Sequence, residues 1–271
     1  MRGSDLMQPE FKIVVIASGS RGNATLIKAG EANFLVDAGI SCRRIRNGLK
    51  GFNLDLEDLD GILITHEHID HVYGLKTISK NFNVNIYANE ETWWNMKGRR
   101  EIRQECIKIM PKKLEVKGVK VESFDISHDA AHPVGYIFKY NNEKCTYLTD
   151  QGKTDEMMYQ ALEGARTVVL EANYDRFMLK NSSYPRSVQE RIMGEFGHLC
   201  NETTGEILAN LDEMPEQVFL AHLSQENNTG RKALETVKEI LMRNNRNETV
   251  EFFVTNAKLM VSNIRSEENG K

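Results

Sequence analysis

The chain has 271 residues, a hydrophobic content of 40% and a formal net charge of −4. This is enough apolar material for one large domain or two small ones, and the acidic balance argues against a protein that binds nucleic acid over its whole surface. With no run of 18 apolar residues and no apolar segment near the N-terminus, neither a membrane span nor a secretory signal is expected.

Segments with strand and helix patterns alternate along the chain, without an internal repeat or a low-complexity linker. In chain order, the predicted strands are 11–16, 24–28, 33–37, 61–65, 85–88, 117–124, 135–140, 144–149, 167–171, 218–221 and 250–254. The predicted helices are 42–48, 72–81, 90–97, 155–163, 185–194, 201–209 and 231–243. The second and third strands are expected to form a hairpin around Gly30. This order predicts an α/β protein in which two sheets pack together with helices outside.

The segment after the fourth predicted strand concentrates side chains that bind metals. His66 and His68 are two residues apart and point the same way, whereas Asp70 and His71 come from the turn that follows and face a neighbouring position. Neutral imidazole and carboxylate groups suit zinc and, with more oxygen ligands, manganese. Because the chain has only seven histidines, this density predicts a site for two metal ions on one loop.

The spacing His66-x-His68-x-Asp70-His71 resembles the signature of the metallo-β-lactamase superfamily. Segments that resemble its other motifs occur in the expected order, one before this signature at 35–39 and three after it at 127–130, 148–150 and 220–224. A closer resemblance, to the WalJ/YycJ-like branch, is carried by 17–23, 128–136, 197–199 and 222–228. The resemblance implies a single domain over 11–264, with the αββα four-layer sandwich of that superfamily. Residues 1–10 are expected to be an extension, partly of vector origin, and 265–271 a frayed tail.

The resemblance also implies a ligand set for two divalent ions, either zinc or manganese, with iron also permitted. His66, His68 and His128 would hold the first ion, Asp70, His71 and His222 the second, and Asp150 would bridge them. Asp37 would orient a ligating histidine through a hydrogen bond. Two ions about 3.5–4 Å apart share a hydroxide and clamp the attacking and leaving oxygens of a phosphodiester. Asp70 has a second predicted task, which is to steer that hydroxide.

Two residues beside these motifs depart from the pattern of the branch. His132 lies where the branch is expected to carry Asp, so it competes with His128 as the ligand of the third motif. Tyr174 stands where the branch usually has His, so a catalytic role of that His would be lost or taken over by the phenol.

Three further residues are candidates for contact with the substrate. His198 resembles a histidine of tRNase Z enzymes and would bind the phosphate or protonate the leaving oxygen, unless it is a structural residue at a helix start. Ser224 would contact a phosphate oxygen, with a plain strand-end hydroxyl as the alternative. Arg21 belongs to a Gly/Ser loop that either lies near the site or is simply a turn.

A basic segment points to the substrate. Residues 97–120 contain nine Lys or Arg and three Glu, and Arg99, Arg100 and Arg103 follow the pair Trp93 and Trp94. Cationic and aromatic side chains together suit a nucleic acid strand, whereas the alternative is a solvated face with a buried Trp. The stretch between the fourth and fifth motifs is too short for the β-CASP insertion of larger RNA-processing nucleases.

The sequence therefore predicts a dinuclear metal-dependent phosphodiesterase, and the resemblance implies a DNA exonuclease that runs 5′ to 3′ and serves DNA repair. A hydrolase of a small cyclic phosphodiester, such as a cyclic nucleotide or a phosphoribosyl cyclic phosphate, is the alternative. A further alternative function is that of a non-catalytic metal-binding regulator. The expected partner is DNA, with no membrane contact. The expected compartment is the cytoplasm, because Cys42, Cys106, Cys145 and Cys200 are far apart and are predicted to be free thiols.

Overall fold

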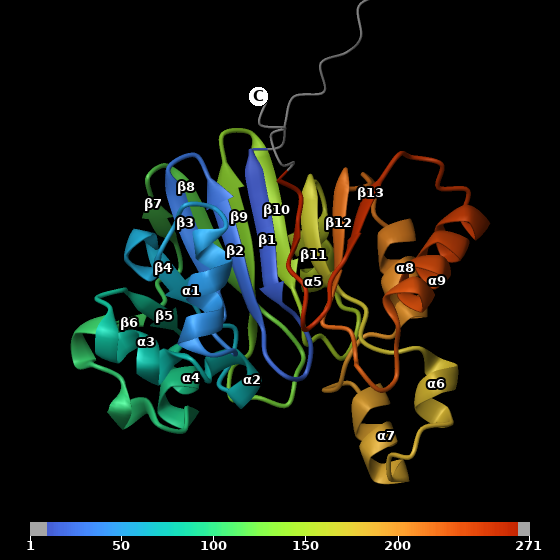
Figure 1. Cartoon of the computed structure of the whole chain (residues 1–271). Helices are drawn as coiled ribbons and strands as arrows, with labels where there is room; N and C mark the ends of the chain where they lie inside the picture. The colour runs from blue at the N-terminus through green and yellow to red at the C-terminus, as the bar shows by residue number, and fades with distance from the viewer. Residues whose placement is uncertain (1–9, 265–271) are drawn as a thin grey trace, which may run out of the picture.

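In the computed structural model, which describes residues 10–264, two seven-stranded sheets pack face to face with helices on their outer faces (Figure 1). The strand orders are β14-β1-β2-β3-β4-β5-β6 and β13-β12-β11-β10-β9-β8-β7. The predicted αββα class is confirmed. Apart from Glu10, the predicted N-terminal extension lies outside the described residues, and so does the predicted tail.

The first sheet is antiparallel on one side and parallel on the other. Its antiparallel strands are β14 (Val261–Ser262), β1 (Phe11–Ala17), β2 (Ala24–Ala29) and β3 (Ala32–Val36). Parallel pairing then continues from β3 through β4 (Gly61–Leu63), β5 (Ile86–Ala88) and β6 (Ile107–Ile109). The helices of this half are α1 (Cys42–Lys50), α2 (Ile69–Val72), α3 (Leu75–Asn81) and α4 (Glu90–Asn95). Three 3-10 turns complete it, at Leu56–Asp58, Arg99–Glu101 and Gln104–Cys106.

The second sheet follows the same plan. Its antiparallel strands are β7 (Leu114–Val116), β8 (Val119–Asp125), β9 (Val134–Tyr140) and β10 (Glu143–Leu148). Parallel pairing continues from β10 through β11 (Thr167–Glu171), β12 (Gln217–Ala221) and β13 (Glu251–Val254). The helices are α5 (Glu156–Leu162), α6 (Arg176–Lys180), α7 (Arg186–Met193), α8 (Asn201–Ala209) and α9 (Gly230–Arg243).

Three layers of apolar side chains hold these four layers of backbone together. Strand β1 shows how, because Ile13 and Val15 face the other sheet whereas Val14 and Ile16 face the helices of the first half. Strands buried on both faces are typical of sheets that helices cover, and they read as continuous apolar runs rather than alternating ones. The four cysteines are free and buried. Among the described residues, no helix combines the length and the apolar character needed to cross a membrane.

All predicted strands are present within a few residues, and the hairpin of β2 and β3 turns at Gly30 as expected. The short strands β6, β7 and β14 and helix α6 were not predicted. The helix predicted over 72–81 is wrong in one respect, since the structure has two short helices there with Gly74 between them. A Cβ at Gly74 would lie 2.5 Å from the carbonyl oxygen of Ile40, so the close packing of this loop requires glycine.

Gly39 sets the position of the loop that carries the histidines. A Cβ on this residue would lie 1.5 Å from the carbonyl oxygen of Asp70, and its amide donates to the carbonyl of Asn23 over 2.7 Å. The amide of Asn23 in turn donates to the same Asp70 carbonyl over 2.8 Å. Three backbone segments therefore meet at this point with no room for a methyl group.

We expect Gly39→Ala to lower the free energy of unfolding by about 3 kcal/mol, because a backbone segment has to move to admit the methyl group. Chemical denaturation measures this. Gly51→Ala is the matched control, since Gly51 has φ −60° and the nearest atom to a Cβ there is 3.4 Å away. Equal stability of the two variants would contradict the tight packing inferred at Gly39.

Candidate metal centre

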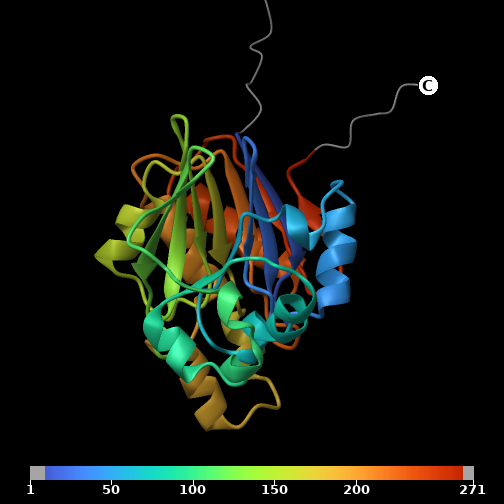
Figure 2. The same ribbon diagram turned by 90° about the vertical axis from the view of Figure 1, so that its left-hand side faces the viewer.

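Loops at one end of the sandwich bring together histidine and carboxylate side chains from both sheets. His66 and His68 lie on the loop after β4, and Asp70 and His71 lie in the first turn of α2 rather than in a plain turn. The loop between β8 and β9, the end of β10 and the end of β12 supply the other three, His128, Asp150 and His222. Figures 1 and 2 show α4 and α7 at this same end of the molecule.

The first group consists of His66, His68 and His128, and one ring nitrogen of each lies within 4.8 Å of the others. Nε2 of His66 is 3.1 Å from Nδ1 of His68, and the ring of His128 is 5.0 Å and 5.2 Å from those two rings. Hydrogen bonds fix two of the rings from behind. Nδ1 of His66 faces the Thr65 hydroxyl at 3.0 Å, and Nδ1 of His128 faces the Gly197 carbonyl at 3.2 Å, which leaves each Nε2 toward the shared centre.

The second group consists of Asp70, His71 and His222, which also meet within 4.8 Å. Nε2 of His71 lies 3.6 Å from a carboxylate oxygen of Asp70 and 3.5 Å from Oδ2 of Asp150. The other oxygen of Asp150 is 3.8 Å from Nε2 of His128, so this carboxylate reaches both groups. The structure thus brings together all seven residues that the resemblance predicts as ligands.

Two buried atoms of this cluster have no hydrogen-bond partner among the described residues. They are Oδ2 of Asp150 and Nε2 of His222. Burying a polar atom without a partner costs free energy, and almost every such atom in a folded protein is satisfied. A carboxylate oxygen and an imidazole nitrogen that converge without partners fit a divalent cation, and so does the donor set of the cluster as a whole.

One buried carboxylate in each sheet holds a histidine of the cluster from behind. Asp37, directly after β3, accepts from Nδ1 of His71 at 2.7 Å and from the backbone amide of Thr65 at 2.9 Å. Glu171, the last residue of β11, accepts from Nδ1 of His222 at 2.8 Å and from Nδ1 of His198 at 2.9 Å. These bonds fix the ring orientation, so Nε2 of His71 and of His222 face the cluster.

The backbone carries strain at three of these positions. Asp37, Asp150 and His222 have φ values of 61°, 62° and 54°. This left-handed region is uncommon for residues other than glycine and persists only where the surroundings over-determine it. Each of the three follows the end of a strand, so the strained residue turns its side chain toward the cluster immediately after the sheet ends.

The electrostatics of the two groups differ. Burial lowers the pKa of His66 and of His128, so these rings are neutral donors. For His71, burial lowers the pKa but the charges of Asp37 and Asp150 outweigh it and raise the value to about 10. For His222, Asp150 and Glu171 outweigh burial in the same way and raise the pKa to about 9. The half of the cluster with the carboxylates therefore attracts positive charge.

His198 lies beside the cluster, as predicted. Its ring centre is 5.1 Å from that of His128 and 5.3 Å from that of His222, and its side chain is partly exposed. His132 is not part of the cluster, because its ring nitrogens contact Glu91 at 3.2 Å and Asp125 at 2.8 Å. The alternative that His132 replaces His128 is therefore wrong.

The predicted substrate contacts lie at different places around the cluster. Arg21 shares a hollow of about 440 Å³ with Asp70. The Ser224 hydroxyl accepts from the amide of Asn227 at 3.1 Å, as a turn residue does. Tyr174 is buried, and its backbone forms a bridge with Cys200.

The basic segment divides into exposed and internal parts. Trp94 is 68% exposed and the guanidinium of Arg99 lies 4.6 Å from the centre of its ring, whereas Trp93 is fully buried. Arg100 is exposed. Arg103 donates to the Phe82 carbonyl at 2.8 Å and pairs with Glu105 at 3.4 Å, and its side chain is 38% exposed, so its role as a substrate contact stays a prediction.

Glu171 is the main site residue that the sequence analysis did not assign. It is fully buried and accepts four hydrogen bonds, from the rings of His198 and His222 and from the amides of Gln151 and Leu199. The available signal was an acidic residue at the end of an apolar run, a position that Asp37 also has after β3.

Comparison with known proteins agrees with this geometry. Residues 32–223 match the family model described as a beta-lactamase superfamily domain. The chain belongs to the metallo-β-lactamase superfamily. Within it, the chain is 37% identical to exodeoxyribonuclease YycJ of Bacillus anthracis over 231 residues, which is 84% of this chain and 88% of that protein. It is also 37% identical to exodeoxyribonuclease WalJ of Streptococcus pneumoniae serotype 2 (strain D39 / NCTC 7466) over 224 residues, 80% of this chain and 83% of the other.

A solved member of the superfamily shares the fold. The metallo-β-lactamase fold protein YhfI of Bacillus subtilis superimposes with a TM-score of 0.68 at 15% identity, over 93% of this chain and 98% of that one. The chain is thus a member of the WalJ/YycJ-like branch and an enzyme of the metal-dependent hydrolase class. Both conclusions confirm the resemblance seen in the sequence.

We expect Glu171→Gln to weaken divalent metal binding by about 10- to 100-fold. Oε1 of Glu171 accepts from both imidazoles and Oε2 accepts from the amides of Gln151 and Leu199, whereas the NH2 group of Gln can accept at neither place. Titration with zinc against a chromophoric chelator measures the affinity. Glu239→Gln is the matched control, since Glu239 is exposed on α9 and pairs only with Arg243 at 3.4 Å. Unchanged zinc affinity in Glu171→Gln would show that the carboxylate does not support the metal centre.

Proposed function

We propose that this protein is a dinuclear metal-dependent DNA exonuclease that digests one strand from its 5′ end, in the cytoplasm and in the service of DNA repair. The observation that carries the proposal is the seven-residue cluster in a chain that matches proteins named exodeoxyribonucleases over most of both lengths. The cluster supports the chemistry, and the relatives support the substrate class.

The charge of the cluster supports two ions. The carboxylates of Asp37, Asp70, Asp150 and Glu171 point into it or brace it, and two divalent cations balance their charge when the imidazoles are neutral. A fifth carboxylate, that of Asp129, lies 3.3 Å from Nε2 of His128 and has its own cation, Arg191, at 3.2 Å. We assign His66, His68 and His128 to one ion and Asp70, His71 and His222 to the other, with Asp150 between them. Zinc and manganese both suit this donor set, and iron is permitted.

When bound, the two ions supply Lewis acidity and lower the pKa of a coordinated water, so that a nucleophile is available near neutral pH. Asp70, whose side chain is 22% exposed, is placed to orient the attacking water. His198 has its Nδ1 held by Glu171 at 2.9 Å, so its Nε2 is free to protonate the leaving oxygen of the phosphodiester. We assign Asp70 and His198 as catalytic residues on this basis.

The surface around the cluster has the character that a nucleic acid strand needs. Beside Asp70, the exposed side chains of Ile69 and Tyr73 share a hollow with the guanidinium groups of Arg21 and Arg44. Phe196 is 59% exposed, and its neighbours on either side hold the loop of His128 through their carbonyls. Apolar and aromatic surfaces accept bases by stacking, and arginines contact phosphates.

We expect the wild type, loaded with manganese, to remove nucleotides stepwise from the 5′ end of duplex DNA, and Asp70→Ala to lose at least about 100-fold in rate because it lacks a metal ligand. Gel analysis of duplexes with nuclease-resistant linkages at either end measures both rate and direction. Asp125→Asn is the matched control, because this exposed carboxylate on the same rim pairs with His132 outside the cluster.

Each alternative function predicts a different result in that experiment. Turnover of a cyclic nucleotide without digestion of DNA would favour the small cyclic phosphodiester. A protein that binds two ions but hydrolyses neither substrate would be a non-catalytic regulator. Equal digestion of DNA by Asp70→Ala would contradict the assignment of the site.

We also expect the double variant Arg99→Gln, Arg100→Gln to bind DNA less tightly and with a weaker dependence on salt. Each lost phosphate contact lowers the slope of log affinity against log salt by about 0.7–0.9, so the pair would lower it by about 1.4–1.8. Fluorescence anisotropy at several salt concentrations measures the slope. The double variant Lys238→Gln, Arg243→Gln on α9 is the control, and an unchanged slope in Arg99→Gln, Arg100→Gln would exclude this patch from the DNA path.

A further inference from the structure

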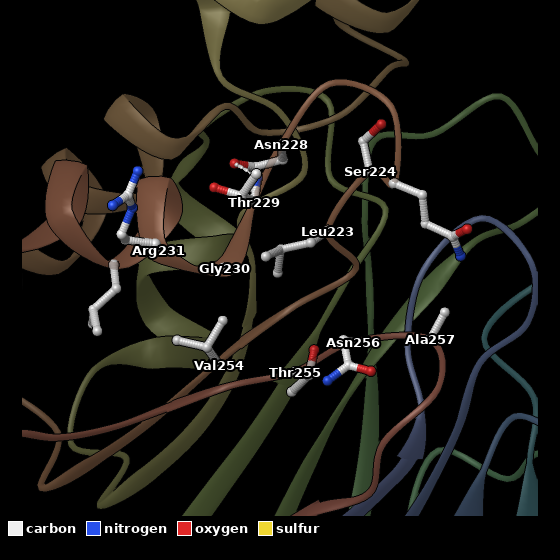
Figure 3. Close-up of a pocket in the computed structure, with 12 residues that line it drawn as sticks. Leu223, Ser224, Asn228, Thr229, Gly230, Arg231, Val254, Thr255, Asn256 and Ala257 are labelled. Carbon is white, nitrogen blue, oxygen red and sulfur yellow. Dashed lines mark hydrogen bonds between the residues drawn. The ribbon is translucent and has the colours of Figure 1, made fainter.

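A hollow of about 600 Å³ lies at the carboxyl ends of β12 and β13, next to the loop that carries His222. Figure 3 shows the three segments around it, which are the loop 223–229, the first turn of α9 and the stretch 254–257. Because β12 and β13 are parallel and α9 connects them, this is a βαβ unit. In such units, phosphate groups bind where the helix starts, outside the carboxyl ends of the strands.

The start of α9 offers free backbone donors to the hollow. The Thr229 hydroxyl accepts from the amide of Lys232 at 3.2 Å and the Thr229 carbonyl from that of Ala233 at 3.0 Å. The amides of Gly230 and Arg231 come before these bonds, where a helix leaves its donors unpaired. A Cβ at Gly230 would lie 2.7 Å from Val254, so glycine lets the helix begin close against β13.

A buried hydroxyl beside the helix start has no partner. Thr255 is 1% exposed, lines the hollow, and its Oγ1 forms no hydrogen bond with any described residue. Figure 3 shows this hydroxyl directed toward the hollow, below Leu223. A buried hydroxyl without a partner destabilises the fold, so its presence here points to a ligand that accepts its hydrogen bond.

The charge and polarity of the lining define the ligand. Arg231 is the charged residue among those that line the hollow, and no carboxylate is among them, although the chain has more acidic than basic residues. The Arg231 side chain is 86% exposed, and its Nε lies 3.9 Å from Glu235 one turn along α9. Leu223, Leu234 and Val254 provide an apolar wall. A positive, donor-rich end beside an apolar wall suits a phosphate attached to a sugar and a base.

We propose that this hollow is a second binding site, for a phosphorylated nucleotide. The amides of Gly230 and Arg231, the guanidinium of Arg231 and the Thr255 hydroxyl bind the phosphate, and Leu223 and Val254 contact the sugar and base. Ser224, two residues after His222, lines the same hollow and connects it to the metal centre. The favoured occupant is a nucleotide of the DNA strand whose end is being hydrolysed, which rests on the proposed function. A free nucleotide has the same chemistry.

Two variants and two probes test the site. Thr255→Val removes the hydroxyl without changing the shape of the side chain, and Arg231→Gln removes the charge. We expect each to weaken binding of dAMP to the metal-loaded enzyme by about three- to ten-fold, measured by calorimetry. We also expect each to raise KM for a long oligodeoxynucleotide by a similar factor, while kcat and KM for bis(p-nitrophenyl) phosphate, a phosphodiester that carries no nucleotide, are unchanged.

The controls separate this site from the metal centre and from changes in stability. Binding of dAMP at the hollow is expected to survive in Asp70→Ala. Arg243→Gln, at the far end of α9, is expected to leave all values unchanged. Because the Thr255 hydroxyl has no partner among the described residues, Thr255→Val is expected to keep or raise the wild-type Tm, whereas a purely structural role would lower Tm and leave dAMP affinity unchanged.

Each result leads to a decision. Weaker dAMP binding together with a higher oligonucleotide KM assigns the site to the DNA strand. Weaker dAMP binding with an unchanged KM assigns it to a free nucleotide. If dAMP does not bind, or binds both variants as it binds the wild type, the proposal is overturned. A wild type that digests no DNA would refute the proposed function, and the dAMP titration would still decide the fate of the second site.

Discussion

The structure of this end of the molecule depends on two buried hydrogen bonds between a carboxylate and an imidazole, one in each sheet. Asp37 holds His71 at 2.7 Å and Glu171 holds His222 at 2.8 Å. A buried carboxylate is costly unless its oxygens are fully paired, and both residues reach that state by accepting backbone amides as well as imidazoles. These two bonds occupy Nδ1 of His71 and of His222 and fix the orientation of each ring. Nε2 of each ring therefore faces the cluster that contains the Asp150 carboxylate.

The fold makes this arrangement by placing residues at the ends of strands from two different sheets. Asp37 follows β3 and His222 follows β12, and each has a positive φ that turns it out of line with its strand. The hydrogen bond from the His222 amide to the Ser18 hydroxyl, at 2.7 Å, joins the second sheet to the loop after β1. The same loop also contacts the Asp70 carbonyl through Asn23. The loop after β1 therefore holds both the histidine loop of the first sheet and His222 of the second.

Much of this could be predicted from the sequence, for a physical reason. His66, His68, Asp70 and His71 are close in the chain, so the pattern itself reveals a metal-binding loop. The order of the layers could be predicted because strands buried on both faces appear in the sequence as continuous apolar runs, and helical segments separate these runs. Glu171 and the pocket of Thr255 were not assigned, because each depends on contacts between segments distant in the chain. The basic segment predicted where charge lies but not the hydrogen bond from Arg103 to the Phe82 carbonyl, which again joins segments distant in the chain.

The overall charge of −4 has a different meaning once the position of the acidic groups is known. Four of the carboxylates lie in or behind the proposed metal centre, where two divalent cations would balance them, and a fifth, that of Asp129, pairs with Arg191. Their charge would therefore not repel a DNA strand. The exposed arginines beside Asp70, which are Arg21 and Arg44, then lie on a surface whose nearest carboxylates are already balanced. Screening limits the reach of each charge to about 8–10 Å at ordinary salt, so this local balance matters more to an approaching phosphate than the sum over the chain. An acidic protein can therefore guide a polyanion to its site, provided that the acidic groups nearest the site are the ones that bind the metal.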